Sequence, residues 1–366
     1  MKKIMIMILF GTIAQTGIAQ TAERWYAFQD QTQLYGYKDA NDVVRIKPRF
    51  TTAPTNFDNI ICVGQYLGNN NKEVVSFDTY FLTKSGRRID HHLYISNRGI
   101  VDSECEGFIR YRHYNMWKLP QFTGLLDRNG DIAIEANRFN YLSRVQNGLL
   151  WAEEGAVCKT SADGRPTWEN GSGIMLIDTT GQVLINADEC MVDQYDMIYL
   201  KLHTCRISPS PHTDSTRVSF MGVNGEYYSF VDYRKEFLTW IKERAKDINE
   251  RNVDSILGPQ ITLQLHNGGG PLYCQPENLE PKYKNSLIQA INAIAKGEAM
   301  HGISQAMSYF FVSDYWINEF AASGKGGNEL PTFEIFKVVE PATSIREHYY
   351  FLDTKQGFKL SKIQMY

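Results

Sequence analysis

Five segments in the first two thirds of the chain share one pattern of apolar and polar residues. Each begins with an apolar run, passes through a polar turn, and continues with a second apolar or alternating run. The five segments are YKDANDVVRI (37–46), FLTKSGRRID (81–90), LLDRNGDIAI (125–134), LIDTTGQVLI (176–185) and FMGVNGEYYS (220–229). Short runs of this kind on either side of a polar cluster are typical of β-hairpins. The pattern therefore predicts five hairpins.

The last position of each turn holds a residue that tolerates an unusual backbone conformation. A hairpin loop commonly ends in the left-handed region, which glycine adopts at no steric cost and asparagine or aspartate less readily. The five residues are Asp42, Gly86, Gly130, Gly181 and Gly225. Their spacings are 44, 44, 51 and 44 residues, so one insertion of seven residues interrupts a regular period. We assign these five as structural turns of a repeat, and the sequence assigns no catalytic or binding residue.

A third apolar run follows each of the first four hairpins, so each unit holds about three strands. These runs lie at 59–64, 107–113, 147–154 and 196–203. One such unit cannot cover its own apolar face, and stacking against its neighbours supplies the core. The pattern predicts a mainly β fold with a tandem β-hairpin repeat array over residues 21–230, either an open solenoid or a propeller-like closure. The insertion at 153–173, rich in Gly, Ser, Asp and Pro, is expected to be a surface loop.

The first unit carries a resemblance to a known family. The run YGYKDANDVVRIKPRFTTAPTNFDNIICVG (35–64) resembles a WG repeat, a motif of tandem bacterial β-rich proteins, with Tyr35 in place of the usual Trp. The residues that carry it are Tyr35, Gly36, Tyr37, Asp39, Ile46, Pro48 and Phe50. Residues 124–152 and 173–185 match more loosely, and the resemblance covers about residues 30–230. It implies a binding or scaffolding array, and the family has no agreed catalytic residues to transfer.

After Ser229 the apolar period changes from 2 to 3.6 residues, which predicts helices. A helix is expected over 232–259, ended by Gly258-Pro259, with further helices over 283–296 and 304–322. The apolar stripe of the first helix holds Tyr233, Phe237, Trp240, Ile241, Ala245 and Ile248. Strands are expected at 261–266, 333–341, 348–353 and 358–366. Helices followed by a terminal hairpin suggest a smaller α+β domain over residues 231–366.

The last of these strands resembles a motif of NTF2-like domains. It reads Gly357-Phe358-Lys359-Leu360-Ser361-Lys362-Ile363, and the last strand of such domains often reads G-aromatic-x-L-x-x-I. The resemblance covers one hairpin. It implies an open cone with a pocket, sometimes catalytic and more often a site for a ligand or partner.

The N-terminus has the composition of an export signal. Lys2 and Lys3 precede the apolar run Ile4–Ala14, and small residues follow at 17–19, which predicts a signal peptide over residues 1–20. An uncleaved anchor is the alternative, but the apolar run has about half of the roughly 20 residues that span a bilayer. No later segment reaches that length. We expect an exported protein, in the periplasm or at the cell surface, with no transmembrane segment after cleavage.

Composition narrows the class of partner. The chain of 366 residues has 38 Lys and Arg against 41 Asp and Glu, a formal net charge of −3. It has no basic field that would attract nucleic acid, and we expect no nucleic-acid partner. The 21 Tyr, 19 Phe and 6 Trp lie beside β-branched residues in short runs, which favours sheets over helical bundles.

The cysteines match no metal-binding pattern. The six residues contain no CxxC pair and no histidine at ligand spacing, so neither a metal nor another cofactor is expected. An oxidising compartment would permit disulfides, and Cys190 with Cys205 is the pairing we favour.

Four further motifs have simple interpretations. DRNGD (127–131) lacks the alternate acidic ligands of a calcium loop and fits a hairpin turn. Ser304 in HGISQAM (301–307) is interpreted as a helix N-cap, because a nucleophile elbow must follow a strand. DHH (90–92) fits a solvated loop, since neighbouring strand residues face opposite ways. His266 and Cys274 in HNGGGPLYC could form a base and nucleophile, but a flexible loop is the simpler interpretation.

Two hypotheses for function follow. The favoured one is a non-enzymatic binding or scaffolding module for a protein or glycan of the cell envelope. The alternative is an enzyme-like or ligand-binding C-terminal domain that acts on a small molecule and is targeted by the array. A C-terminal pocket with two or more ionisable groups would favour the enzyme, whereas an interior filled with Phe and Ile side chains would remove it.

Overall fold

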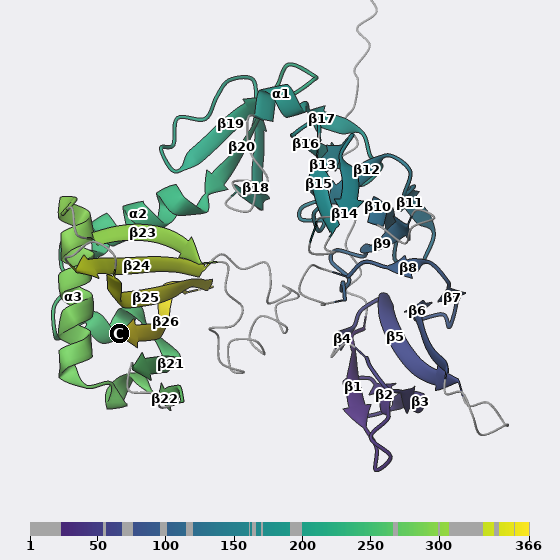
Figure 1. Ribbon diagram of the computed structural model, residues 1–366, viewed down its shortest axis with the longest axis horizontal. Helices are drawn as coiled ribbons and strands as arrows, with labels where there is room; N and C mark the ends of the chain where they lie inside the picture. Colours follow the sequence, from purple (N-terminus) through teal and green to yellow (C-terminus); the bar gives the residue numbers. More distant parts are fainter. Residues whose placement is uncertain are drawn as a thin grey trace, which may run out of the picture.

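The computed structural model describes residues 23–53, 56–67, 76–95, 101–114, 120–160, 162, 166–169, 171–190, 200–265, 270–298, 301–306, 332–339, 344–354 and 356–365. The fold is mainly β, as predicted, with 53% strand and 15% helix, and none of its sheets is closed. The sheets follow one another in an arc that leads into a helix-covered sheet at the C-terminal end (Figure 1). The predicted signal peptide, residues 1–20, lies outside the described residues.

Antiparallel hairpins lie at all five repeated segments. They are formed by β2 (Tyr35–Lys38) and β3 (Val44–Phe50), β6 (Ser76–Thr83) and β7 (Arg88–Ile89), β10 (Pro120–Leu126) and β11 (Ile132–Ile134), β16 (Ile174–Asp178) and β17 (Val183–Ile185), and β19 (Arg217–Met221) and β20 (Tyr227–Asp232).

The five turns have the same backbone geometry. The predicted turn residues all have positive φ angles, 62° for Asp42 and 76–87° for Gly86, Gly130, Gly181 and Gly225. In every turn the N–H of this residue donates to the carbonyl three residues earlier. The N–H of that earlier residue donates to the carbonyl four residues ahead, and these hydrogen bonds measure 2.7–3.1 Å. Glycine adopts this conformation without strain, which explains why it stands at four of the five positions.

The strand that precedes each hairpin completes a sheet. In the first four sheets β1 (Trp25–Gln29), β5 (Ile60–Leu67), β9 (Ile109–Tyr114) and β13 (Leu149–Glu154) pair with the first strand of the hairpin that follows. In the fifth sheet β18 (Leu200–Ser208) pairs instead with β20, the second strand. The short strands β4 (Asn56–Phe57), β8 (His92–Leu93) and β12 (Phe139–Leu142) extend the first, third and fourth sheets. We number the sheets one to five in chain order.

Neighbouring residues of the middle strands face different cores. Because side chains alternate along a strand, one residue can pack on the preceding sheet and the next residue on the following sheet. Three pairs divide in this way: Ile61 and Ile60, Leu126 and Leu125, and Leu150 and Leu149. Sheets two, three and four therefore bury apolar side chains on both faces. This arrangement supplies the core that an isolated hairpin lacks.

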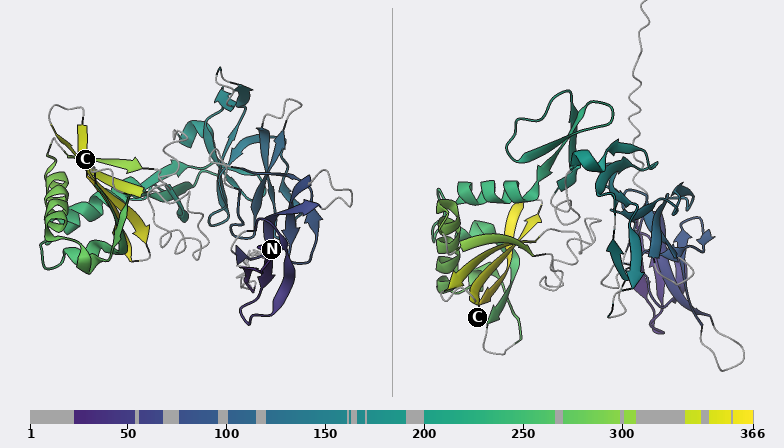
Figure 2. Two further views of the ribbon diagram at one scale, coloured as in Figure 1. Left: turned by 60° about the horizontal axis from the view of Figure 1, so that its bottom comes forward. Right: turned by 45° about the horizontal axis from the view of Figure 1, so that its top comes forward.

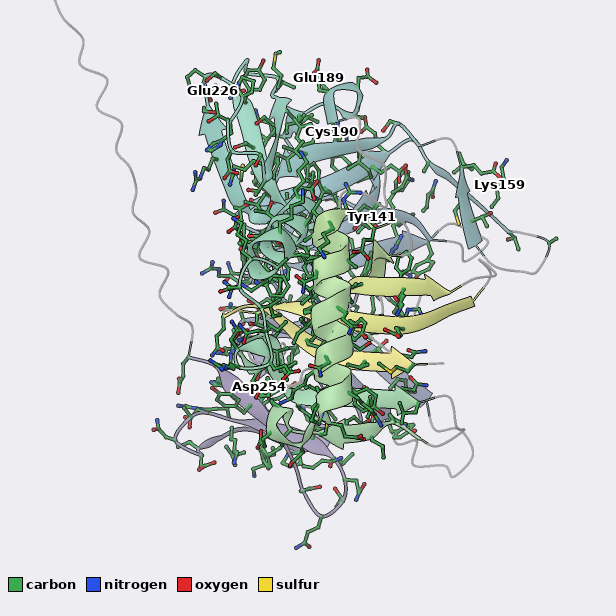
Figure 3. The ribbon with its side chains drawn as sticks, turned by 90° about the vertical axis from the view of Figure 1, so that its left-hand side faces the viewer. Tyr141, Lys159, Glu189, Cys190, Glu226 and Asp254 are labelled. Atoms are coloured by element: carbon green, nitrogen blue, oxygen red, sulfur yellow. The ribbon has the colours of Figure 1, made fainter. Side chains whose placement is uncertain are left out.

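The insertion at 153–173 is not simply a loop. It contains β14 (Val157–Thr160) and β15 (Pro166–Glu169), which form a separate two-stranded sheet that projects from the rest, as Lys159 marks in Figure 3. The predicted surface loop is therefore a hairpin: its strand β14 is largely exposed, as expected, but it pairs its backbone groups with β15. β13 and β16 pair directly beneath it, so the fourth sheet is uninterrupted. The short helix α1 (Ala187–Cys190) follows β17.

The C-terminal part is built on a six-stranded sheet. Its strands are β21 (Leu257–Leu265), β22 (Leu272–Cys274), β23 (His301–Ala306), β24 (Thr332–Val339), β25 (Ser344–Thr354) and β26 (Gly357–Met365). The strand order is β22-β21-β26-β25-β24-β23, and only β21 and β26 run parallel. Helices α2 (Tyr233–Arg244) and α3 (Pro281–Lys296) pack on one face of this sheet (Figure 2). Two 3-10 turns, η2 (Val253–Ile256) and η3 (Pro276–Asn278), complete it.

Two helix predictions need correction. The helix predicted over 232–259 ends at Arg244, and Gly258-Pro259 lies inside β21. Polar side chains compete for the backbone after the helix, since Asn249 and Asn252 both donate to the carbonyl of Asp247. The helix predicted over 304–322 is also wrong at its start, because Ser304 lies in β23 opposite Glu334 and is no N-cap. The rest of that range lies outside the described residues.

The fifth sheet joins the C-terminal part without a linker. Asp232, the last residue of β20, caps α2 by accepting the N–H of Arg234 at 2.8 Å. The Lys201 ammonium of β18 lies 2.5 Å from a Glu236 oxygen of α2 and 2.9 Å from a carboxylate oxygen of Asp353 in β25. Lys201 is buried, so this contact ties three elements together.

Candidate functional site

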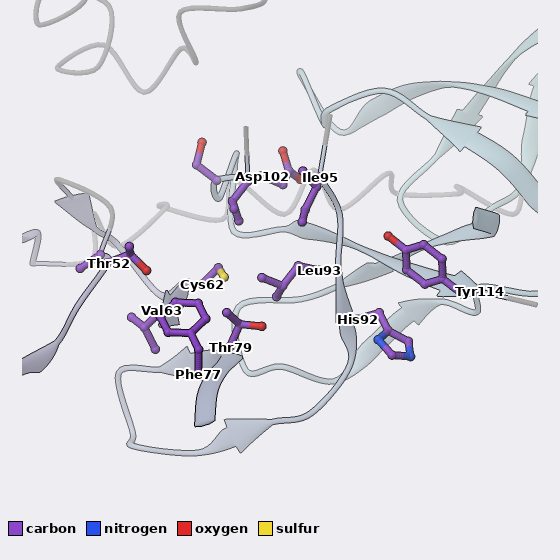
Figure 4. A pocket seen from close by; sticks show the side chains of 13 residues that line it. Thr52, Cys62, Val63, Phe77, Thr79, His92, Leu93, Ile95, Asp102 and Tyr114 are labelled. Atoms are coloured by element: carbon purple, nitrogen blue, oxygen red, sulfur yellow. The ribbon is translucent and has the colours of Figure 1, made fainter. Parts of the chain in front are cut away.

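A groove of about 660 Å³ opens between the second and third sheets (Figure 4). Both sheets and the segment after β3 contribute to its walls. The lining residues are Thr52, Ala53, Cys62, Val63, Phe77, Thr79, His92, Leu93, Ile95, Val101, Asp102, Ser103 and Tyr114. A volume of this size and a largely apolar wall are typical of binding sites.

The groove exists because the two sheets differ in length. β5 and β6 pair over eight residues, whereas β8, the edge of the third sheet, has only two. Phe77 and Thr79 lie on the same face of β6 as Phe81, which is buried against the third sheet. Among the described residues, this face extends beyond the opposing strands. Gly64 makes room for the Phe77 ring, since a Cβ at Gly64 would lie 2.5 Å from its Cζ atom.

Apolar side chains surround the mouth of the groove. Tyr66 and Phe77 are 60% and 49% exposed, and their rings form an edge-to-face pair with centroids 5.5 Å apart. Ile95 and Val101 are exposed at the opposite wall. Apolar residues gathered in this way mark sites of interaction, whereas single exposed ones do not.

The charged side chain in the groove wall is neutralised by its neighbours. Asp102 is buried and accepts hydrogen bonds from the Arg110 Nε, Nη2 and backbone N atoms at 2.8–3.0 Å. The Nε atom of Arg144 lies 3.2 Å from it. Burial would raise the pKa of Asp102, but the two guanidinium charges and the hydrogen bonds outweigh it and lower the pKa to about 2. Asp102 is thus a fixed structural anion.

The other polar groups of the groove suit binding more than reaction. Burial raises the pKa of the Cys62 thiol to about 12, so it is protonated at neutral pH and is a poor nucleophile. The His92 ring packs edge-to-face on Tyr114 at the end of the groove, with centroids 5.2 Å apart. The hydroxyls of Thr52, Thr79 and Ser103 supply neutral hydrogen-bonding groups.

The residues predicted from sequence lie elsewhere in the structure. None of the five turn residues lines the groove. Two of these turns contact neighbouring units: the Arg87 Nη1 atom donates to the carbonyl of Asn129 in the third turn at 3.1 Å, and Arg138 Nη1, just before β12, donates to that of Gly181 in the fourth turn at 3.5 Å. The groove residues went unrecognised because their alternation resembles that of any strand.

The calcium-loop and histidine motifs carry no metal site. Asp127 accepts the backbone N–H groups of Asn129 and Asp131 at 2.8 and 2.9 Å, so its carboxylate stabilises the turn. His91 stacks on Tyr111, while His92 lies in β8, so DHH is not a loop throughout. In the described part of the chain, no cluster of three or more His, Cys, Asp or Glu residues could hold a metal ion.

The structure bears on two interpretations of the cysteines, the Cys190–Cys205 disulfide and the motif that contains Cys274. Cys190 and Cys205 are both free thiols, so the predicted disulfide is wrong. Both pack against the apolar cluster between the fourth and fifth sheets. Cys274 lies in β22, and its presumed partner His266 lies outside the described residues. Burial raises the pKa of Cys274 as well, which does not suit a nucleophile.

The space between the C-terminal helices and their sheet is filled with aromatic rings. Phe237 of α2 lies 4.7 Å from Phe333, 5.4 Å from Phe351 and 4.9 Å from Phe358, measured between ring centroids. All four side chains are buried. An interior filled with Phe side chains is the result that the sequence analysis named as evidence against the enzyme hypothesis. It counts against a small-molecule site between these helices and the sheet.

Ionisable residues lie on the other face of that sheet. Glu334, Tyr350 and Lys362 occupy paired positions on three adjacent strands, and all three are buried. Glu334 pairs with His348, and the Lys362 ammonium lies over the Tyr350 ring at 5.5 Å. Burial lowers the pKa of Lys362 to about 8. These groups are engaged with one another, as in a buried polar network.

No family model matches the chain, and the searches of curated proteins and of solved structures also found no match. The resemblances to WG repeats and NTF2-like domains therefore rest on the sequence motifs quoted above. Among the described helices, none combines the length and the apolar character needed to cross a bilayer.

Proposed function

We propose that this is an exported, non-enzymatic repeat protein that binds an apolar segment of a cell-envelope protein in the groove between its second and third sheets. The observation that carries the proposal is the groove itself, which has a volume of about 660 Å³ and a largely apolar lining in the part of the chain that the structure describes. Its mouth is rimmed by half-exposed aromatic side chains. A monomeric soluble protein rarely leaves such a surface uncovered without a partner.

The rest of the proposal concerns the scaffold. A tandem array of WG-like units occupies residues 21–230 and an α+β domain, NTF2-like in type, occupies 231–366. The identical turn geometry and the sequence of shared cores support the array. An open array is favoured over a propeller-like closure, because no core cluster of the described residues joins the first sheet to the fifth. The altered strand order of the fifth sheet fits a terminal unit.

A protein segment suits the groove better than a glycan. A sugar presents many hydroxyl groups, and each one buried without a hydrogen-bond partner costs about 1–3 kcal/mol. The groove offers few such partners, the hydroxyls of Thr52, Thr79 and Ser103, because most of its other lining side chains are apolar. Apolar side chains of a peptide gain from the same surface, at roughly 25 cal/mol per Å² removed from water.

Affinity capture with matched variants tests this function. Residues 21–366 are immobilised and exposed to solubilised envelope, and the retained proteins are compared with those held by Phe77→Asp and Val223→Asp. Val223 is a control because it is similarly exposed, 53% against 49%, but lies in the turn of the fifth hairpin. We expect Phe77→Asp to lose a protein that the wild type and Val223→Asp retain. Equal retention by all three, with all three folded, would contradict the proposal.

A further inference from the structure

One wall of the groove is a short segment held mainly by side chains. Val101, Asp102 and Ser103 lie between β8 and β9 and belong to no extended strand. The backbone contacts are an isolated bridge between Ile95 and Val101 and a hydrogen bond from Asp102 N to the carbonyl of Tyr94 at 3.0 Å. The position of this wall therefore depends on the groups that bind the side chains of Asp102 and Ser103.

One of those groups comes from the next unit of the chain. Arg144 lies in the connection between β12 and β13, which belong to the fourth sheet. Its Nε atom is 3.2 Å from Asp102 Oδ1, and its Nη2 atom donates to Ser103 Oγ at 2.5 Å. The side chains of Arg144 and Asp102 are 8% and 3% exposed. A residue about 40 positions away thus touches two of the three wall residues.

The geometry of this contact restricts motion. A guanidinium is planar and always charged, and its donors point in fixed directions, so two simultaneous contacts fix both partners relative to it. Moving the wall outward would leave buried charges without their hydrogen bonds, which is costly. Arg110 holds Asp102 from within the same sheet and donates its Nη1 to the carbonyl of Leu142 in the fourth sheet at 2.8 Å. Arg144 comes from the fourth sheet itself and contacts the wall residues Asp102 and Ser103 directly.

We propose that Arg144 is a positioning residue for the groove: it fixes the wall formed by residues 101–103, so the site is assembled from three successive sheets. This inference rests on the proposed function, since it concerns the same groove. It deepens that function by making affinity for the apolar segment depend on a side chain that does not line the groove.

The role in positioning is separable from a role in stability. Arg144→Lys keeps a positive charge beside Asp102 but offers a compact ammonium in place of a two-armed fork. Ser103→Ala removes one contact and leaves the ion pair intact. Arg138→Lys is the control for a cross-unit contact, because Arg138, which is more exposed than Arg144, donates to the carbonyl of Gly181 and does not line the groove.

The test is a fluorescence titration of residues 21–366 with N-phenyl-1-naphthylamine, a neutral apolar probe. We expect the wild type to bind it and Phe77→Asp to bind at least tenfold more weakly, which places the probe in the groove. Arg144→Lys should raise the Kd about five- to tenfold, Ser103→Ala about threefold, and Arg138→Lys not at all. Hydrogen exchange at Asp102 and Ser103 should be about tenfold faster in Arg144→Lys than in Arg138→Lys.

The outcomes separate the two proposals. If the wild type fails to bind the probe, or Phe77→Asp binds equally well, the proposed function is contradicted and the role of Arg144 is contradicted with it. If the probe binds in the groove but Arg144→Lys and Ser103→Ala match the wild type in Kd and in exchange, only the role of Arg144 is overturned. Melting temperatures measured in parallel identify a variant that has lost its fold. Hydrogen exchange at Asp102 in Ser103→Ala then decides the question, because Ser103 lines the groove and the Kd of this variant also reflects the lost hydroxyl.

Discussion

Two turn glycines provide a matched pair that isolates the contact between neighbouring sheets. Gly86 and Gly130 occupy the same position in successive hairpins, with φ angles of 87° and 76°. A Cβ added at Gly86 would meet no atom within 4 Å, whereas one at Gly130 would lie 2.4 Å from Ile89 Cδ1. Ile89 belongs to the preceding sheet. Alanine at Gly86 therefore adds backbone strain alone, and alanine at Gly130 adds strain and a clash with the neighbouring unit.

The two effects have different magnitudes. A non-glycine residue in the left-handed region costs roughly 1–2 kcal/mol. Overpacking of a filled core costs a further 1–3 kcal/mol, because the neighbour must move. We expect Gly86→Ala to destabilise the folded protein by about 1 kcal/mol and Gly130→Ala by about 3 kcal/mol. Asp42→Gly should stabilise it by roughly 0.5 kcal/mol, since it relieves strain and loses only the exposed pair with Lys38.

Differential scanning calorimetry measures these differences. For a unit of roughly 200 residues, 1 kcal/mol shifts the Tm by about 2–4 °C. Gly86→Ala should therefore lower the Tm by about 3 °C, Gly130→Ala by about 9 °C, and Asp42→Gly should raise it slightly. Equal shifts for Gly86→Ala and Gly130→Ala would refute the packing of one turn against the preceding sheet.

The remaining predictions concern acid stability, the junction and the insertion. The pKa of Asp102 is about 2 against an ordinary 3.8, so its charged form stabilises the fold, and about 2 kcal/mol of unfolding free energy is lost as the pH falls from about 5 to 2. Acid titration of Asp102→Asn should lack this loss of stability. The same acid profile in the variant and the wild type would count against the buried ion pair. Lys201→Met leaves two carboxylates at the junction without their cation. This should lower the free energy of unfolding by about 3–5 kcal/mol, and a variant that melts at the wild-type Tm would argue against the junction. Replacing Val157–Glu169 with a short glycine loop should change the free energy of unfolding by less than about 0.5 kcal/mol, because β13 and β16 pair without this hairpin. A loss of several degrees in Tm would show that the hairpin supports the sheet.

Local rules in the sequence were sufficient to predict the strands of the repeat. Each turn is specified by one residue with an unusual φ angle, and each strand by the alternation of apolar and polar residues. The positions of the hairpins and the period of the repeat can therefore be read from a single sequence. The pattern did not reveal which strands would pair. β18 joins the second strand of its hairpin, and nothing in the sequence of Leu200–Ser208 distinguishes it from β13.

The errors arose where tertiary contacts override local signals. Gly258-Pro259 reads as a helix stop, yet this dipeptide lies inside a strand that pairs with β26 about 100 residues later. Two tight turns, Glu106-Gly107 and Asn147-Gly148, lie outside the repeated hairpins, and all four of their residues have positive φ angles. Glu106 accepts the N–H groups of Asn147 and Gly148 at 2.7 and 3.0 Å, a contact between units that no local pattern contains.

The candidate site was the least predictable feature. Phe77 and Tyr66 read as ordinary strand residues, and their exposure depends on where the third sheet ends. Arg144 is about 40 residues from the wall that it contacts. Sites of this kind depend on the relative length of stacked sheets, which is a property of the assembled fold.

Site-specific photo-crosslinking in the living cell tests the central claim most directly. A benzophenone side chain is placed at Phe77 in the groove, or at Val223 on the far turn as a matched exposed position. We expect irradiation to link position 77 to a discrete protein and to give no such adduct at position 223. An adduct at both positions, or none at Phe77, would contradict the claim that the groove is where this protein binds its partner.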